Sequence, residues 1–218
     1  QAKTSPNPMG LVVNKAKGSY IFDSKGKKYL DFVAGISACS LGHRHPKVIK
    51  AIKKQLNKFL HVMVYGEYVQ KSSVDLCKKL AGFLPKSLEV TFLTNSGTEA
   101  IEGAMKLAKR YTKKSNFIAA KNSYHGSTQG ALSLLGVRDQ KKGYGPLLPK
   151  VSFIDFNKYE DLVKIDNNTA AVILETIQGG AGFIEPKLDY LKNVKKKCKE
   201  MGALLILDEI QPGIGRTG

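Results

Sequence analysis

Hydrophobic and polar positions follow different periods in the two parts of the chain. Segment 19–33 predicts two short strands around the polar turn at 23–26, because turn-forming residues interrupt its apolar pattern. Pro46 is suited to the first turn of a helix, and apolar residues then recur at helical spacing to about residue 60. A second helical run covers about 69–83 and stops before Pro85.

From residue 88 onward, apolar runs alternate with helical segments. We predict strands at 88–93, 117–120, 151–154, 170–175 and 203–208, separated by helical segments at about 97–111, 128–134, 158–164 and 187–200. The run AAVIL that precedes Glu175 is apolar at every position, which is typical of strands covered by helices on both faces. Strands separated by helices form right-handed βαβ units, so the predicted fold class is α/β with a mostly parallel sheet.

The net charge changes this picture little. Lys and Arg number 35 against 18 Asp and Glu, which gives +17. The excess is mostly lysine and lies on the polar faces of two predicted helices, at Lys53, Lys54 and Lys58 and at Lys192, Lys195, Lys196, Lys197 and Lys199. Basic strands with interleaved aromatic residues are absent from the sequence, so we expect solvated faces and no nucleic-acid partner.

Composition also bears on compartment. No run of about 18 apolar residues occurs, and the first residues lack the pattern of a signal peptide, so we expect no membrane association. The three cysteines, Cys39, Cys77 and Cys198, are widely spaced and without metal-ligand spacing. We therefore expect no disulfide framework, no metal site and a cytoplasmic setting.

A polar motif lies at the end of four of the predicted strands. In open α/β sheets, ligands bind at the carboxyl ends of the strands. The motifs at these ends are TNSGT at 94–98, KNSYHG at 121–126, ETIQG at 175–179 and DEIQ at 208–211.

The first motif has two interpretations. Ser96 followed by Glu99 is a capping box, which satisfies backbone donors at a helix start. Gly97 would also leave bare amides at a positive helix terminus beside the Thr98 hydroxyl, which makes a phosphate cradle. In the second motif, Tyr124 is either a packing residue or a platform for a planar ring. His125 is either a hydrogen-bonded loop histidine, which we favour, or a proton carrier.

Two carboxylates end buried strands. Asp208 must be paired, either with a Lys or Arg or with a cationic ring nitrogen, in which case Ile210 would pack on the ring and Gln211 would reach a ring oxygen. An Asp-Glu pair at a strand end also suits magnesium, but the chain lacks the phosphate-binding motif of nucleotide triphosphatases. Glu175 either contacts a ligand or orients the region of Asp208.

Five segments together resemble the class III aminotransferases, pyridoxal-phosphate enzymes of fold type I that include acetylornithine, ornithine and 4-aminobutyrate aminotransferases. The segments are YLDFVAGISACSLGHRHPKVIKAI at 29–52, FLTNSGTEAIEGAMKLAKRY at 92–111, SYHGST at 123–128, ILETIQGGAGF at 173–183 and LLILDEIQPGIGRTG at 204–218. The resemblance implies that residues 1–60 belong to the small domain and residues 61–218 to the first part of the large cofactor-binding domain.

The resemblance also implies roles for the strand-end residues. Gly97 and Thr98, with Ser96, resemble the phosphate clamp, and Tyr124 and His125 resemble residues beside the cofactor ring. Asp208 resembles the partner of the pyridine nitrogen, Ile210 and Gln211 resemble ring contacts, and Glu175 resembles the active-site glutamate behind them.

Three departures from the family pattern stand out. The Schiff-base lysine of the family lies beyond GRTG and is not in this chain, which resembles the N-terminal half of a subunit. Ser127 stands where acetylornithine and ornithine enzymes usually have an arginine that grips a carboxylate. Gly180 stands where they have a second acid.

The resemblance implies a homodimeric, cytoplasmic aminotransferase that moves an amino group from an amino acid or ω-amine to a 2-oxo acid. Another pyridoxal-phosphate activity on the same scaffold, an aminomutase or a decarboxylase, is an alternative. A basic, non-catalytic binding module would be the alternative if the gene ends at residue 218.

Overall fold

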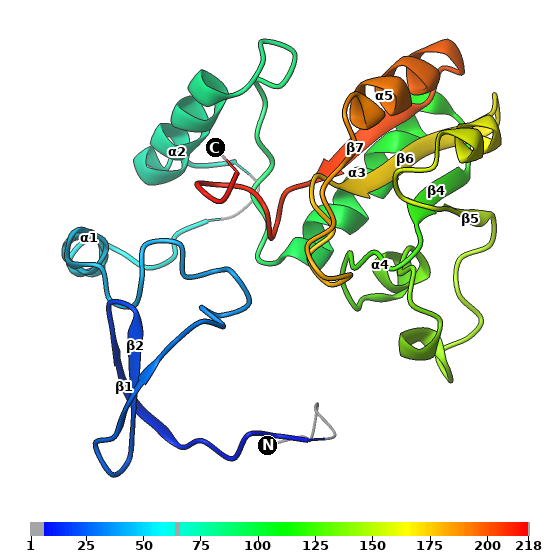
Figure 1. Cartoon of the computed structure of the whole chain (residues 1–218). Coiled ribbons are helices and arrows are strands. Elements are labelled where there is room, and N and C mark those ends of the chain that lie inside the picture. The colour runs from blue at the N-terminus through cyan, green and yellow to red at the C-terminus, as the bar shows by residue number, and fades with distance from the viewer. Residues whose placement is uncertain (1–6, 64–65, 218) are drawn as a thin grey trace. The chain divides into compact units, whose positions relative to one another are not determined.

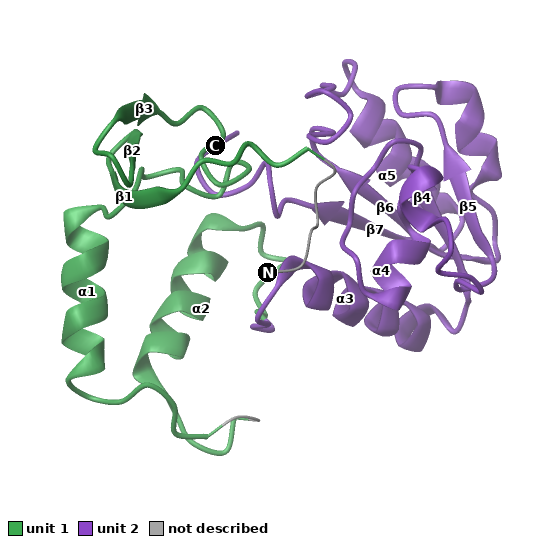
Figure 2. Ribbon diagram, turned by 90° about the horizontal axis from the view of Figure 1, so that it is seen from below, with its two compact units in different colours: residues 1–91 green, residues 92–218 purple. Residues whose placement is uncertain are grey.

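The chain folds as two units, residues 1–91 and residues 92–218, which are described separately (Figures 1 and 2). The computed structural model describes residues 7–63 and 66–217. The boundary at residue 60 concerns the domains of a complete family member, and it stays a prediction.

The N-terminal unit holds a small antiparallel sheet and two helices. Strands β1 (Val13–Lys17), β2 (Tyr20–Asp23) and β3 (Lys28–Leu30) pair in that order. The predicted hairpin is therefore confirmed as β2 and β3, whereas the alternation in β1 was too weak to predict that strand. Helix α1 (Pro46–Leu56) begins at the expected proline, and α2 (Lys71–Phe83) ends before Pro85 as predicted.

The C-terminal unit is built around a four-stranded parallel sheet in the order β5-β4-β6-β7. Its elements in chain order are α3 (Gly97–Thr112), β4 (Asn116–Ala120), α4 (Gln129–Ser133), η1 (Asp139–Lys141), β5 (Val151–Ile154), η2 (Tyr159–Lys164), β6 (Thr169–Glu175), α5 (Tyr190–Glu200) and β7 (Leu204–Asp208). The predicted α/β class with a parallel sheet is confirmed.

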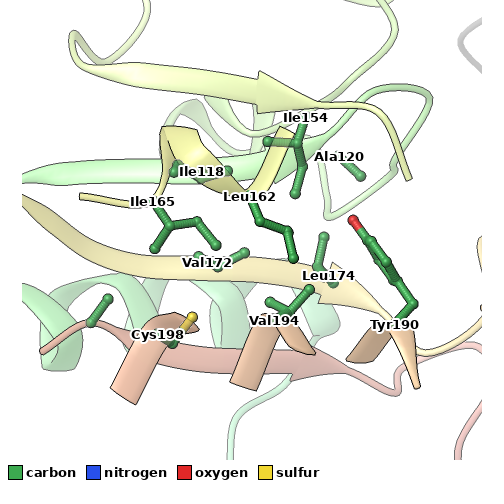
Figure 3. Close-up of a cluster of buried hydrophobic side chains, with 11 residues drawn as sticks. Ile118, Ala120, Ile154, Leu162, Ile165, Val172, Leu174, Tyr190, Val194 and Cys198 are labelled. Carbon is green, nitrogen blue, oxygen red and sulfur yellow. The ribbon is translucent and has the colours of Figure 1, made fainter. Parts of the chain in front are cut away.

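Alternate residues of the central strands supply two separate hydrophobic clusters. Ile118, Val172 and Leu174 pack with Val194 and Cys198 of α5 on one face of the sheet (Figure 3). On the opposite face, Phe117, Ala171 and Ile173 pack with α3 and α4, and Figure 2 shows α3 and α4 across the sheet from α5. Every residue of β6 is buried, which explains why its sequence is apolar without alternation.

Three predictions from the sequence were wrong. Helix α1 ends at Leu56 and not near residue 60. Residues 88–93 form no strand, and Val90 and Phe92 are 90% and 82% exposed. A strand needs a neighbour for its backbone groups, and this segment pairs with none of the strands in the described part of the chain. The helix expected from residue 187 begins at Tyr190, because Asp189 adopts a left-handed backbone with φ of 63°.

In the described residues, no helix has both the length and the apolar character that a membrane span requires.

Candidate functional site

Two carboxylates lie side by side at the carboxyl edge of the parallel sheet. Strand β6 ends at Glu175 and β7 ends at Asp208, and the register pairs these two residues across the strands. Both residues are buried, at 4% and 5% exposure. The predicted convergence of these strand ends is therefore present, and two adjacent buried acids require polar partners.

The partner of Asp208 is a histidine and not a lysine or arginine. Nδ1 of His125 lies 2.8 Å from Oδ2 of Asp208, and the two side chains are 0% and 4% exposed. Oδ1 of Asp208 accepts a hydrogen bond from the amide of Ile210 at 3.0 Å. Because a carboxylate only accepts, Nδ1 of His125 is the donor.

The other ring nitrogen of His125 has no such partner. Nε2 is buried and makes no hydrogen bond to any residue the structure describes. An unpaired buried polar atom is costly. The aspartate and histidine therefore form a fixed pair with one unsatisfied position.

Glu175 binds backbone on two loops at the sheet edge. Its Oε2 accepts from the amide of Tyr124 at 3.4 Å, and its Oε1 accepts from the amide of Gly179 at 3.3 Å. Burial raises the pKa of the Glu175 carboxyl, while the electrostatic effect of His125 and the two amide bonds partly oppose the shift. Glu175 thus holds the loop with Tyr124 against the loop after β6.

The turn at the start of α3 carries bare backbone donors. Ser96 caps the helix by accepting from the amide of Glu99 at 3.3 Å, and the Glu99 carboxylate accepts from the amide of Asn95 at 2.8 Å, so the predicted capping role is confirmed. The amides of Gly97 and Thr98 have no acceptor among the described residues. Ile210 lies against Gly97, where an added Cβ would collide with it.

The Thr98 hydroxyl is engaged in a hydrogen-bond chain. Thr128 donates its hydroxyl proton to Oε1 of Glu102 at 2.6 Å, so the 2.7 Å bond between the two threonine hydroxyls is donated by Thr98. The amide of Thr128 also donates to the Thr98 hydroxyl at 3.2 Å. Thr98 therefore offers its amide to the open side of the turn, while its hydroxyl proton is directed at Thr128.

Glu102 is a residue that the sequence did not reveal. Its Oε1 also accepts from the amides of Gly130 and Ala131, at 2.8 and 3.1 Å, and so caps α4 from the neighbouring helix α3. A Cβ at position 130 would collide with the Glu102 carboxylate. The partners lie 26 to 29 residues away in the chain, so no local motif marks this interaction.

Gly126 completes the contact between this loop and α3. Its φ of +127° is disfavoured for residues with a side chain, and a Cβ there would collide with Thr98. The loop that carries Tyr124 and His125 is thereby held directly against the start of α3.

The remaining candidate residues are Tyr124, Gly180, Gln211 and Ser127, and they follow the same strand ends of the sheet. Tyr124 is 51% exposed, and Gly180 lies beside it with room for a side chain. Gln211 lies against Gly179, where a Cβ would collide with its amide group. Ser127 is exposed.

These features suit the phosphorylated pyridine ring that the family resemblance implies. Free amides at a helix start bind a phosphate, and a buried carboxylate matches a protonated ring nitrogen. An exposed tyrosine beside them can cover a ring face. The residues present therefore fit pyridoxal phosphate.

Comparison with known proteins points to the family that the sequence resembles. A sequence profile of the family described as Aminotransferase class-III matches residues 1–218. A LysW-aminoadipate semialdehyde/glutamate semialdehyde transaminase from Sulfolobus acidocaldarius is 40% identical over 96% of this chain and 54% of its own length. An acetylornithine aminotransferase from Bacillus anthracis is 41% identical over 94% of this chain and 52% of its own.

A solved structure is also similar. An amine transaminase from an uncultivated Pseudomonas species, in a PLP-bound form, has a TM-score of 0.85 and 26% identity over 98% of this chain and 57% of its own. The chain thus spans about half the length of the curated relatives it matches.

Proposed function

Because the chain belongs to the class-III aminotransferases, we propose that the protein moves an amino group from an amino acid or ω-amine to a 2-oxo acid with pyridoxal phosphate. The observation that carries this proposal is the buried pair of Asp208 and His125 at the sheet edge. When bound, the cofactor supplies an electron sink for the carbon that loses a proton.

The residues at the edge would hold the cofactor by separate groups. The amides of Gly97 and Thr98 would bind its phosphate, and the Ser96 cap keeps them at the helix start. Tyr124 and Ile210 would contact the ring faces, and Gln211 would contact the ring oxygen.

Asp208 and its supports would set the charge state of the ring. A carboxylate opposite the ring nitrogen stabilises a proton there, and His125 fixes the orientation of that carboxylate. Glu175 would act as a positioning residue, because its two bonds go to backbone amides of the loops that carry Tyr124 and Gly179.

Cofactor binding is the first test. We expect the full-length protein, freed of cofactor and titrated with pyridoxal phosphate, to develop a visible absorbance band that saturates. Thr98→Val should bind nearly as well as the wild type, because the amide remains. A protein that gives no spectral change on addition of pyridoxal phosphate would disprove the proposal.

The donor is a second and finer proposal. Arginine would grip a substrate carboxylate by two charge-assisted bonds, whereas the exposed Ser127 offers one neutral hydroxyl. Charged bonds contribute about 1.5–3 kcal/mol and neutral ones about 0.5–1.5 kcal/mol. We therefore propose that selection for an α-carboxylate is weaker by roughly 10-fold or more, and that acetylornithine is a poor donor compared with an amine whose far end is less acidic or differently placed.

The donor test compares kcat/KM for acetylornithine, ornithine, putrescine and 4-aminobutyrate in the wild type and in Ser127→Arg. The variant should gain most in kcat/KM with donors that carry a carboxylate at the end far from the reacting amine. Gly180→Glu is a companion variant, since the structure leaves room for a side chain beside Tyr124. A wide wild-type preference for acetylornithine would contradict the role assigned to Ser127.

The assembly and setting follow from the same proposal. We propose a cytoplasmic homodimer, as the family resemblance implies. Light scattering of the full-length protein after size-exclusion chromatography measures its mass, and a monomer at micromolar concentration would contradict the dimer.

A further inference from the structure

Three side chains of the N-terminal unit form a relay that the proposed transamination does not use. Asp31 follows strand β3, and its Oδ2 lies 2.6 Å from Nε2 of His43. The other ring nitrogen of His43, Nδ1, lies 3.8 Å from Sγ of Cys39. A thiol, an imidazole and a carboxylate are therefore in line.

Backbone hydrogen bonds hold the histidine and the aspartate of the relay in place. The amide of His43 donates to the carbonyl of Gly18 at 2.8 Å, and the amide of Gly18 donates back at 2.9 Å. Oδ1 of Asp31 accepts from the amides of Val33 and Ala34, at 3.1 and 3.0 Å. The imidazole is thus fixed relative to the carboxylate.

The positions of the protons follow from the partners. The hydrogen bond from His43 holds the pKa of the Asp31 carboxyl below its ordinary value, so Asp31 is a carboxylate and accepts. His43 therefore carries its proton on Nε2, and in the neutral ring Nδ1 is an acceptor that faces the thiol. A nucleophile, a base and a carboxylate that orients the base constitute an activated nucleophile.

We infer that Cys39 is a reactive thiol that exchanges with low-molecular-weight disulfides. The thiol proton passes to Nδ1 of His43, and the sulfur attacks one sulfur of the disulfide. A mixed disulfide on Cys39 forms as the original bond between the two sulfurs breaks, and the departing thiolate takes the proton from His43. Cys39 is oxidised, and the departing half of the reagent is reduced to a thiol.

The chain contains two internal controls. Cys77 in α2 is half-buried like Cys39, but no imidazole lies within hydrogen-bond distance of it among the described residues. Cys198 in α5 is buried, and burial raises the pKa of its thiol to about 12. One labelling experiment on one protein therefore compares an assisted thiol, an unassisted thiol and an inert thiol.

The experiment treats the reduced, full-length protein with the aromatic disulfide DTNB near neutral pH and follows each mixed disulfide by mass spectrometry. We expect Cys39 to react about 10-fold faster than Cys77, because Nδ1 of His43 is placed to accept the thiol proton as the sulfur attacks. Cys198 should stay unlabelled. Equal rates at Cys39 and Cys77, or a faster Cys77, would overturn the inference.

Variants separate assistance from simple exposure. His43→Gln should lower the rate at Cys39 to about that at Cys77 and leave Cys77 unchanged, and an undiminished Cys39 rate would overturn the inference. Labelling of Cys198 would reveal that this variant has unfolded. In that case Asp31→Asn is the deciding variant. A lower labelling rate at Cys39 with an unchanged rate at Cys77 supports the relay, and an unchanged rate at Cys39 refutes it.

Discussion

Among the residues described, each unit contains one aspartate–histidine pair, and the two pairs differ in burial and in the ring nitrogen that makes the contact. His125 meets Asp208 through Nδ1 at 2.8 Å, with the side chains 0% and 4% exposed. His43 meets Asp31 through Nε2 at 2.6 Å, with the side chains 22% and 11% exposed. The same two residue types are thus placed in a dry setting and in a partly solvated one.

The difference shows that the second ring nitrogen determines what each pair can do. In the C-terminal unit, Nε2 of His125 is buried and unpaired among the described residues, so the imidazole serves Asp208 alone. In the N-terminal unit, Nδ1 of His43 faces the half-buried Cys39. The first pair is suited to hold a charge in place, and the second is suited to move a proton.

The largest expected effect is the loss of stability when each histidine is removed. His125→Ala leaves the buried Asp208 without its partner, and breaking such a pair costs about 3–5 kcal/mol. His43→Ala acts on a partly exposed pair, for which we expect a much smaller loss of stability. Denaturant unfolding of both cofactor-free variants at full length measures the difference, and equal losses would show that burial does not distinguish the pairs.

The next effect is on catalysis by the full-length enzyme. Asp208→Asn keeps size and hydrogen bonding but removes the charge proposed to stabilise the ring proton. A loss of about 3 kcal/mol of transition-state stabilisation lowers the rate on the order of 10²-fold. Asp31→Asn is the matched control and should change kcat by less than about 3-fold. Near-normal turnover in Asp208→Asn would give that residue a purely structural role.

A smaller effect concerns how each histidine loop is anchored. The loop of His43 is held by backbone bonds to Gly18, whereas the loop of His125 is tied to α3 through Thr128 and Glu102. Glu102→Ala should destabilise the protein by about 2 kcal/mol, because three hydrogen bonds are lost, one of them from a hydroxyl.

Glu102→Gln keeps an acceptor oxygen at this position and should recover roughly half of that loss. Its affinity for pyridoxal phosphate, measured by absorbance, should also lie closer to that of the wild type than the affinity of Glu102→Ala does. An alanine variant as stable as the wild type would show that the contacts to α4 contribute little.

The smallest effect is a dependence of folding stability on pH, with opposite signs for Glu175 in one unit and Asp31 in the other. Burial raises the pKa of Glu175 in the folded protein, so stability falls as the pH rises from the ordinary value through the raised one. The hydrogen bond from His43 lowers the pKa of Asp31, so that contribution is present above the ordinary value and is lost as the pH falls.

The unfolding free energy of Glu175→Gln, relative to the wild type, should therefore be most favourable at neutral pH. That of Asp31→Asn should be most favourable in acid. Unfolding free energies of both variants and the wild type across the acidic range measure these slopes. Slopes of the same sign in the two variants would contradict the assignments.

Much of the sheet could be predicted because burial on both faces leaves a direct mark in the sequence. Strand β6 is apolar along AAVIL and buried at every residue, whereas β7 is apolar along LLIL but only partly buried before Asp208. Segment 88–93, LEVTFL, was also predicted as a strand but forms none, because its pairing depends on a neighbour that the local sequence does not specify.

The site could be predicted less completely than the sheet. Topology brought Glu175 and Asp208 together as expected, since parallel strands end at one edge. The histidine partner of Asp208, the helix cap from Glu102 and the contact between His43 and Cys39 depend on the conformations of loops. Periodicity carries no information on such contacts.

The contacts around residues 126 and 130 also determine which positions of this loop can be substituted when the substrate preference is redesigned. A side chain at Gly126 would collide with Thr98, and one at Gly130 would displace the Glu102 carboxylate from its hydrogen bonds. Between them, Ser127 is exposed and makes no hydrogen bond to any of the described residues. A saturation library should therefore tolerate nearly every residue at 127 and almost none at 126 or 130, so diversity spent on the two glycines would be wasted.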